Sequence, residues 1–288
     1  MTHHARLNLV MTITIIGLIV FLYFKPQSSG NTEYSLTSGS VEAAQHVRIV
    51  KQQQETVLKR RDGHWYLVKP VQAWADDEKI GKILEILRAR SQQHFPLVDL
   101  GRFGLERPHV QLSIDNARFD FGGFAPTTHQ QYVATGDYVY LLAPRYALAL
   151  PRNISDLINP GLLAPDEIPV KFELPHGEVE FYDAHWRVTP QHADGALNAE
   201  TLRHWVLLWQ SARAVELKAA AELTADFAEN GLITIDLRDE RKIKLKILHN
   251  QFSIVLLRVE EGIGYQFPLE TGRQLLDPSV FSAANSAR

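Results

Sequence analysis

The sequence contains no cysteine among its 288 residues. Without cysteine there is no disulfide, no thiolate nucleophile, no zinc finger and no cysteine-bound iron–sulfur cluster. Positive charge is not in excess either, because 30 Lys and Arg stand against 33 Asp and Glu, which argues against nucleic acid as a partner. The Gly-x-Ser-x-Gly, P-loop, Gly-x-Gly-x-x-Gly and His-Glu-x-x-His motifs are absent as well. We therefore expect no enzymatic activity, no cofactor and no metal site.

A long apolar run stands near the N-terminus, at Leu7–Phe24. As a helix this run would span about 27 Å, close to the thickness of the hydrocarbon layer. The alternative is a cleaved signal peptide, but its apolar stretch is usually shorter, and Lys25-Pro26 follows here in place of a small-residue cleavage site. We predict that residues 1–26 form a single transmembrane anchor. The short N-terminal flank favours a C-terminal part outside the cytoplasm, although Arg6 and Lys25 give almost no charge asymmetry.

Changes in composition divide the rest of the chain. Residues 27–45 are rich in Ser, Thr, Gly and Gln and are predicted to be a flexible tether. A proline-rich but apolar stretch at 143–167 is predicted to be a packed connector. The predicted units are a first one at 46–142, a second one at 168–276 and a tail at 277–288.

An internal repeat links the two predicted units. The tetrapeptide Asp62-Gly63-His64-Trp65 recurs 121 residues later as Asp183-Ala184-His185-Trp186. We predict that the chain holds two copies of one unit, in which Trp65 and Trp186 have the same structural role.

Each tetrapeptide is followed by one amphipathic helix. Apolar residues recur at helical spacing over Ile80–Leu87 and over Leu202–Trp209. Asp76 and Asn198 precede these runs at equivalent positions and are predicted to be their N-caps.

Alternation of apolar and polar residues predicts strands on both sides of each helix. The strands are expected at 46–51, 55–60, 109–115, 117–121, 131–135 and 138–142 in the first unit, and at 168–174, 178–182, 232–237, 242–249, 252–258 and 264–267 in the second, with one more after each tetrapeptide. Connections of hairpin length require antiparallel neighbours. The predicted fold class is α+β, with three strands, a helix and four strands in each mostly antiparallel unit.

The first unit resembles a bacterial family of domains of unknown function, number 4340. The matching residues are Val47–Val50, Thr56–Arg60, Asp62-Gly63-x-Trp65, Pro70, Ala75-Asp76, Ile80–Leu87, Phe103-Gly104-Leu105-x-x-Pro108, Phe121-Gly122-Gly123, Tyr132-Val133 and Tyr138–Leu142. The resemblance covers about 46–163 and, more weakly, the second unit, which lacks the Gly-Leu-x-x-Pro signature. It implies a single-span, envelope-facing protein that often occurs with ATP-binding-cassette transport components. It carries no catalytic residue over to this chain.

One loop distinguishes the first unit from the second. A connection from Gly122 to Gln131 stands where the second unit has only Asn250-Gln251. Loops of this kind often carry binding function, and a glycine pair permits backbone shapes that other residues resist. The candidate partner-binding residues are Gly122, Gly123, Phe124, Pro126, Thr127, Thr128 and His129. A tolerated, inert insertion is the alternative.

Three lysines, Lys242, Lys244 and Lys246, alternate along one predicted strand. They indicate a solvated strand face or a protected sheet edge, with a phosphate- or nucleic-acid-binding stripe as the alternative.

These observations favour a membrane-anchored periplasmic accessory or scaffold protein. The Leu7–Phe24 helix would hold it at the membrane, and the units would bind another envelope protein, such as a transport-system component. The alternative is a small-ligand binder or an envelope enzyme that uses a cleft between the two units, since domain interfaces commonly form pockets.

Overall fold

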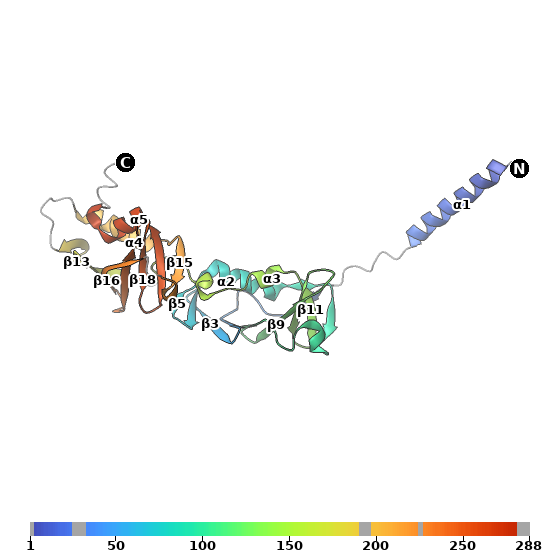
Figure 1. Cartoon of the computed structure of the whole chain (residues 1–288), viewed down its shortest axis with the longest axis horizontal. Helices are drawn as coiled ribbons and strands as arrows, with labels where there is room; N and C mark the ends of the chain where they lie inside the picture. Colours follow the sequence, from blue (N-terminus) through green and yellow to red (C-terminus); the bar gives the residue numbers. More distant parts are fainter. Residues whose placement is uncertain (1–2, 25–32, 190–196, 224–226, 281–288) are drawn as a thin grey trace.

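The structure, a computed structural model, describes residues 3–24, 33–189, 197–223 and 227–280. Two sheet-containing units lie next to each other, and the helix α1 (His3–Phe24) lies beyond the first unit (Figure 1). In the described part of the chain, no helix combines the length and the apolar character needed to cross a membrane. The transmembrane role of Leu7–Phe24 stays a prediction.

The first unit is built on a nine-stranded sheet in which all neighbours are antiparallel. Its strands are β2 (His46–Lys51), β3 (Gln54–Arg61), β4 (His64–Lys69), β5 (Ala73–Trp74), β7 (His94–Pro96), β8 (Val110–Ile114), β9 (Ala117–Phe124), β10 (Gln131–Thr135) and β11 (Tyr138–Leu142). They lie in the order β5-β4-β3-β2-β8-β9-β10-β11-β7. The helix α2 (Asp77–Leu84) and the 3-10 turn η1 (Glu85–Arg88) add their apolar side chains to the core, while η2 (Leu100–Phe103) contributes Phe103 to a smaller cluster.

The second unit is an eight-stranded antiparallel sheet. Its strands are β12 (Pro169–Leu174), β13 (Gly177–Tyr182), β14 (His185–Thr189), β15 (Glu216–Ala219), β16 (Ala228–Leu237), β17 (Lys242–His249), β18 (Ser253–Arg258) and β19 (Ile263–Pro268). They lie in the order β14-β13-β12-β16-β17-β18-β19-β15. The helices α4 (Ala199–Ser211) and α5 (Leu269–Leu276) pack on this sheet, and η4 (Ala220–Glu222) follows β15. The α+β class and the mostly antiparallel sheets are thus confirmed.

The two main helices begin where their capping side chains satisfy free backbone N–H groups. The Asp76 carboxylate accepts hydrogen bonds from the N–H groups of Glu78 and Lys79, and the Asn198 side chain accepts one from Thr201. Each helix then buries one apolar stripe. The buried residues are Ile80, Ile83 and Leu84 in α2, and Leu202, Trp205, Val206 and Trp209 in α4.

The repeated tetrapeptides form two hairpin turns of the same type. Asp62-Gly63 joins β3 to β4, and Asp183-Ala184 joins β13 to β14, with positive φ at all four residues. Two-residue turns of this kind match the twist of antiparallel strands. Trp65 then stands in a paired position of β4 and is buried, whereas Trp186 is half-buried and packs on Phe172 and Phe181.

The connector between the units is packed against both of them. It contains α3 (Arg145–Leu148) and η3 (Ile154–Leu157). Asn159 donates its backbone N–H to the carbonyl of Trp74 in β5, and Leu162 donates to Ala212 at the end of α4. Its apolar residues belong to one buried cluster that includes side chains of both sheets. The two units therefore share a continuous core.

Two expectations need correction. Within 27–45, the predicted tether, Tyr34–Ser35 forms the strand β1, which pairs with β6 (Arg90–Ser91), and Ala44 is fully buried. The described part of that segment thus belongs to the first unit. The predicted count of four strands after each helix is also too low, because β7 and β15 add an edge strand next to β11 and β19. Both were missed because they are short and lack a clear alternation of apolar residues.

Candidate functional site: the cleft between the two units

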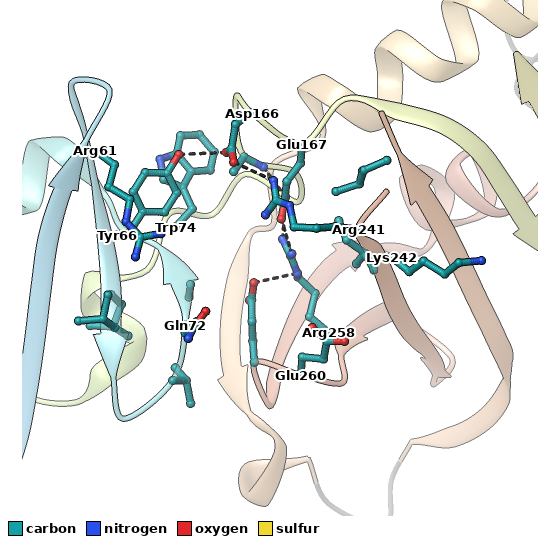
Figure 2. A pocket seen from close by; sticks show the side chains of 18 of the residues that line it. Arg61, Tyr66, Gln72, Trp74, Asp166, Glu167, Arg241, Lys242, Arg258 and Glu260 are labelled. Carbon is teal, nitrogen blue, oxygen red and sulfur yellow. Dashed lines mark hydrogen bonds and ion pairs between the residues drawn. The ribbon is translucent and has the colours of Figure 1, made fainter. Parts of the chain in front are cut away.

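A cleft of about 680 Å³ lies between the two sheets (Figure 2). The first unit supplies side chains from β4 and β5, and the second unit supplies the ends of β16, β17 and β18. The connector supplies Ala164, Asp166 and Glu167. Ionisable residues converge on it from all three segments. They are Arg61, Asp62, Asp166, Glu167, Arg241, Lys242, Lys244, Arg258, Glu260 and Glu261.

Asp166 joins the two units at one side of the cleft. The Tyr66 hydroxyl of β4 donates to its Oδ1 at 3.0 Å, and Arg241 Nη2 donates to its Oδ2 at 2.8 Å. Arg241 is held in turn by Asp239, whose carboxylate accepts from its Nε at 2.6 Å. Burial and the nearby Asp166 carboxylate raise the pKa of Tyr66, so the phenol stays protonated and remains a donor. One carboxylate thereby bridges a strand of the first unit and a turn of the second.

A buried ion cluster holds the connector to the second unit. Arg258 donates to Glu167 at 2.7 and 3.1 Å, to Glu261 at 2.8 Å and to the Leu162 carbonyl at 3.1 Å. Burial alone would lower the pKa of Arg258, but the two carboxylates raise it, and the guanidinium keeps its charge. Burial raises the pKa of Glu261 to about 7, although Arg258 and the hydroxyl of Tyr265 oppose this shift. Two carboxylates share one cation here, so the cluster carries surplus negative charge when both are ionised.

Other groups at the wall of the cleft are open to a ligand. Among the described residues, Lys244 and Glu260 have no ion-pair partner, and both are exposed. The indole N–H of Trp74 is buried and, within the same part of the chain, meets no acceptor. Arg61 lies over the Tyr66 ring at 5.9 Å. The cleft therefore presents the Lys244 ammonium and the Glu260 carboxylate to polar groups of a ligand, while the Trp74 N–H lies buried beneath its wall.

The lysine stripe predicted from the sequence lies on an inner strand. β17 pairs with β16 on one side and β18 on the other, so the interpretation as a protected edge is wrong. Lys242 pairs with Asp236 at 3.0 Å and Lys246 with Glu229 at 3.5 Å, both across to β16. Lys244 stands opposite Thr234, which leaves its ammonium free at the cleft.

The predicted partner-binding loop lies away from this cleft. β9 continues to Phe124, whose side chain is 55% exposed, and the connection that follows is closed by a hydrogen bond from Ala125 N–H to the Gln130 carbonyl. Pro126, Thr127, Thr128 and His129 form that connection, and His129 has a positive φ. The structure does not test whether these residues bind a partner.

The glycine pair at the start of that loop has a different role from the expected one. The φ angles of Gly122 and Gly123 lie outside the left-handed range. A Cβ on Gly122 would instead clash with the Phe103 carbonyl and lie 2.9 Å from Leu105 Cγ. Gly122 therefore permits the close approach to β9 of the Phe103-Gly104-Leu105 segment, which carries the family signature.

His64 and Asp77 form the clearest polar pair outside the cleft. The Asp77 carboxylate lies 2.7 Å from His64 Nδ1 and accepts the Trp65 backbone N–H at 2.7 Å. It therefore joins the start of α2 to the first tetrapeptide turn, a structural role. In the described ranges, no group of three or more His, Asp or Glu side chains is placed to hold a metal ion.

The fold and the cleft define a two-unit antiparallel α+β protein with a polar interface site. Residues 65–173 match the family described as Domain of unknown function (DUF4340), so the resemblance noted in the sequence is confirmed. The match includes Tyr66, Trp74, Asp166 and Glu167 of the cleft. No curated protein and no solved structure is detectably similar to the chain.

The residues that join the two units at the cleft were not among the candidate site residues of the sequence. Tyr66, Asp166 and Arg241 are separated by 100 and 75 residues. They belong to no spaced motif, so only the folded chain brings them together. Lys244 was part of a recognised pattern, and the pattern did not distinguish it from its two neighbours.

Proposed function

We propose that the protein is a membrane-anchored accessory protein that binds another envelope protein in the periplasm. In this proposal α1 is the anchor in the bacterial inner membrane. Two observations support it: Leu7–Phe24 is almost continuously apolar, and every described side chain of α1, from residue 11 to 21, is exposed. A helix with so many exposed apolar side chains needs a lipid or protein environment to cover it.

The proposal includes a duplication of one α+β unit. The order β14-β13-β12-β16-β17-β18-β19-β15 corresponds strand by strand to β4-β3-β2-β8-β9-β10-β11-β7. The equivalent hairpin turns and the equivalent N-caps of α2 and α4 also support it. Two copies placed next to each other create a cleft that a single copy lacks, and domain interfaces are common binding sites.

One observation carries the proposed binding role. Ion-paired side chains hold the cleft in shape, and unpaired charged side chains lie at its wall. Asp166 and the Arg258 cluster hold the two units and the connector in place. Lys244 and Glu260 lie at the wall of the cleft and have no ion-pair partner among the described residues. Polar groups held by a rigid frame bind with little loss of side-chain entropy. We infer that an acidic segment of the partner enters the cleft and pairs with Lys244.

Affinity purification in mild detergent tests this role. The full chain and its Lys244→Glu variant would be compared by mass spectrometry of the proteins they retain. We expect the variant to lose the partner while keeping the wild-type melting temperature, because Lys244 is exposed. Arg203→Glu, a charge reversal on the exposed face of α4, is the matched control. Equal recovery with Lys244→Glu would exclude the cleft as the docking site.

A small polar ligand is a second candidate for the cleft. Its volume lies within the range of about 300–1,000 Å³ that is usual for ligand sites, and the Trp74 N–H is a buried donor without an acceptor in the described chain. Native mass spectrometry of the purified full chain separates the two candidates. A bound small molecule that is lost from Lys244→Glu favours a ligand, and an unliganded chain that still captures a protein favours the scaffold.

The proposed topology has its own test. A C-terminal reporter that is active only in the periplasm should be active on the full chain. Activity of a cytoplasm-specific reporter at the same position would show that the C-terminal part lies inside and that the proposed localisation is wrong.

A further inference from the structure

Four exposed apolar side chains gather at the free edge of the first sheet. They are Leu97, Val98, Leu100 and Tyr138, named here the β7 face. Leu97 N–H donates to the carbonyl of Asp137 at 3.0 Å, and Val98 N–H donates to the carbonyl of Pro96 at 2.8 Å. Tyr138 is the register partner of Pro96. These contacts place the four residues together at the end of β7, and Val98 is the most open, with 65% of it exposed.

The β7 face lies where the chain from α1 joins the first unit. Tyr34 of β1, the first strand after α1, stacks on His94 with ring centroids 4.0 Å apart. His94 stacks in turn on Tyr138 at 4.6 Å. Figure 1 shows β11, the neighbour of β7, at the end of the first unit that is turned toward α1, with the second unit at the opposite end.

The length of the connection limits how far this end lies from α1. Only residues 25–32 separate Phe24 from Glu33. Eight residues reach at most about 29 Å when fully extended. With α1 in a membrane, this end of the first unit is thus held within reach of the lipid headgroups.

We propose that the β7 face contacts the interface of the lipid bilayer. This inference rests on the proposed anchoring by α1. Tyrosine with aliphatic side chains suits the headgroup region, where a ring is half in apolar surroundings and half in water. The charged residues next to the face are the carboxylates Asp99 and Asp137 and one cation, Arg102, so apolar insertion and not attraction to anionic lipid drives the contact.

Site-specific fluorescence tests the proposal, and the absence of cysteine makes single labels unambiguous. Val98→Cys, Phe252→Cys and Ile16→Cys would each be labelled in the full chain and reconstituted in vesicles of zwitterionic lipid. The lipid carries a nitroxide near the headgroup for Val98 and Phe252, and near the middle of the acyl chain for Ile16. Val98 tests the β7 face. Phe252, exposed in the β17–β18 turn of the second unit, is the matched control, and Ile16 reports on the anchor.

We expect the lipid nitroxide to quench the label at Val98 clearly more than the label at Phe252, and to the same degree when anionic lipid is added. Equal quenching at Val98 and Phe252 would overturn the proposal. A second copy of the chain that covered the β7 face would produce this result. If Ile16 is quenched while Val98 and Phe252 are quenched equally, the proposed anchoring by α1 still holds. If neither Ile16 nor Val98 is quenched, the proposed anchor fails together with this inference.

Discussion

The two tetrapeptide turns differ at one residue, and that residue has a cost in stability. Gly63 and Ala184 occupy the same turn position with φ of 87° and 64°. A side chain in the left-handed region costs about 1–2 kcal/mol relative to the right-handed one, and glycine avoids this cost. We predict that Ala184→Gly raises the free energy of unfolding by about 1 kcal/mol.

Denaturant unfolding measures this effect. Gly63→Ala is the reciprocal control: a Cβ there would meet no atom within 4 Å, so its expected loss of stability reports backbone strain alone. If Ala184→Gly leaves the midpoint unchanged, the strain assigned to this turn is not present.

The glycine pair in β9 gives a second prediction at the residue scale. Gly122→Ala should lower the free energy of unfolding by about 1–3 kcal/mol, because the added Cβ overlaps the Phe103 carbonyl and the backbone has to move. Gly123→Ala is the matched control, since its Cβ would lie 3.6 Å from the same oxygen, an ordinary contact. Thermal unfolding compares the two, and equal melting temperatures would contradict the close approach.

At the scale of elements, the cluster of Glu167, Arg258 and Glu261 makes stability depend on pH. The pKa of Glu261 is about 7 in the folded chain and 4.5 in the reference state. The folded state binds the proton of the Glu261 carboxyl more tightly than the unfolded state does. The contribution of this proton to stability is therefore complete below pH 4.5 and is lost as the pH rises through 7. Glu261→Gln removes this loss of stability at higher pH, because glutamine does not ionise.

We therefore predict that Glu261→Gln gains about 1–3 kcal/mol of stability relative to the wild type between pH 5 and pH 8. Urea unfolding at both pH values checks the difference. Glu260→Gln, at the exposed neighbouring position, should follow the wild type. A constant difference between Glu261→Gln and the wild type would show that Glu261 keeps its charge throughout this range.

Most elements were predictable because each carries its own periodicity. The strands 131–135, 138–142 and 242–249 were located at their observed bounds, and the N-caps Asp76 and Asn198 identify where the helices begin. The edge strands β7 and β15 were not predictable, since three or four residues give no alternation and their pairing depends on distant partners. The cleft was foreseen only as a possible space between units, because its contacts join residues 75 to 100 positions apart.

At the scale of the whole molecule, the shared core predicts that the two units unfold together. Leu162 is fully buried, and its backbone joins α4 through Ala212 and β18 through Arg258. We predict that Leu162→Ala costs about 2–5 kcal/mol and accelerates hydrogen exchange in β2 of the first unit as well as in β18. Leu148→Ala, an exposed position of the same connector, should change neither. Faster exchange in β18 alone would show that the units unfold independently.

The path of the connector also sets the order in which the molecule is completed during synthesis. Ile158 forms a bridge with Ala75, so the last contacts of the first sheet arrive only after its strands have been made. The bridge from Gly161 to Arg213 must wait for some fifty more residues to leave the ribosome. A nascent chain thus exposes the apolar side of Leu162 and Leu163 during this interval, when premature association with other chains would be most harmful.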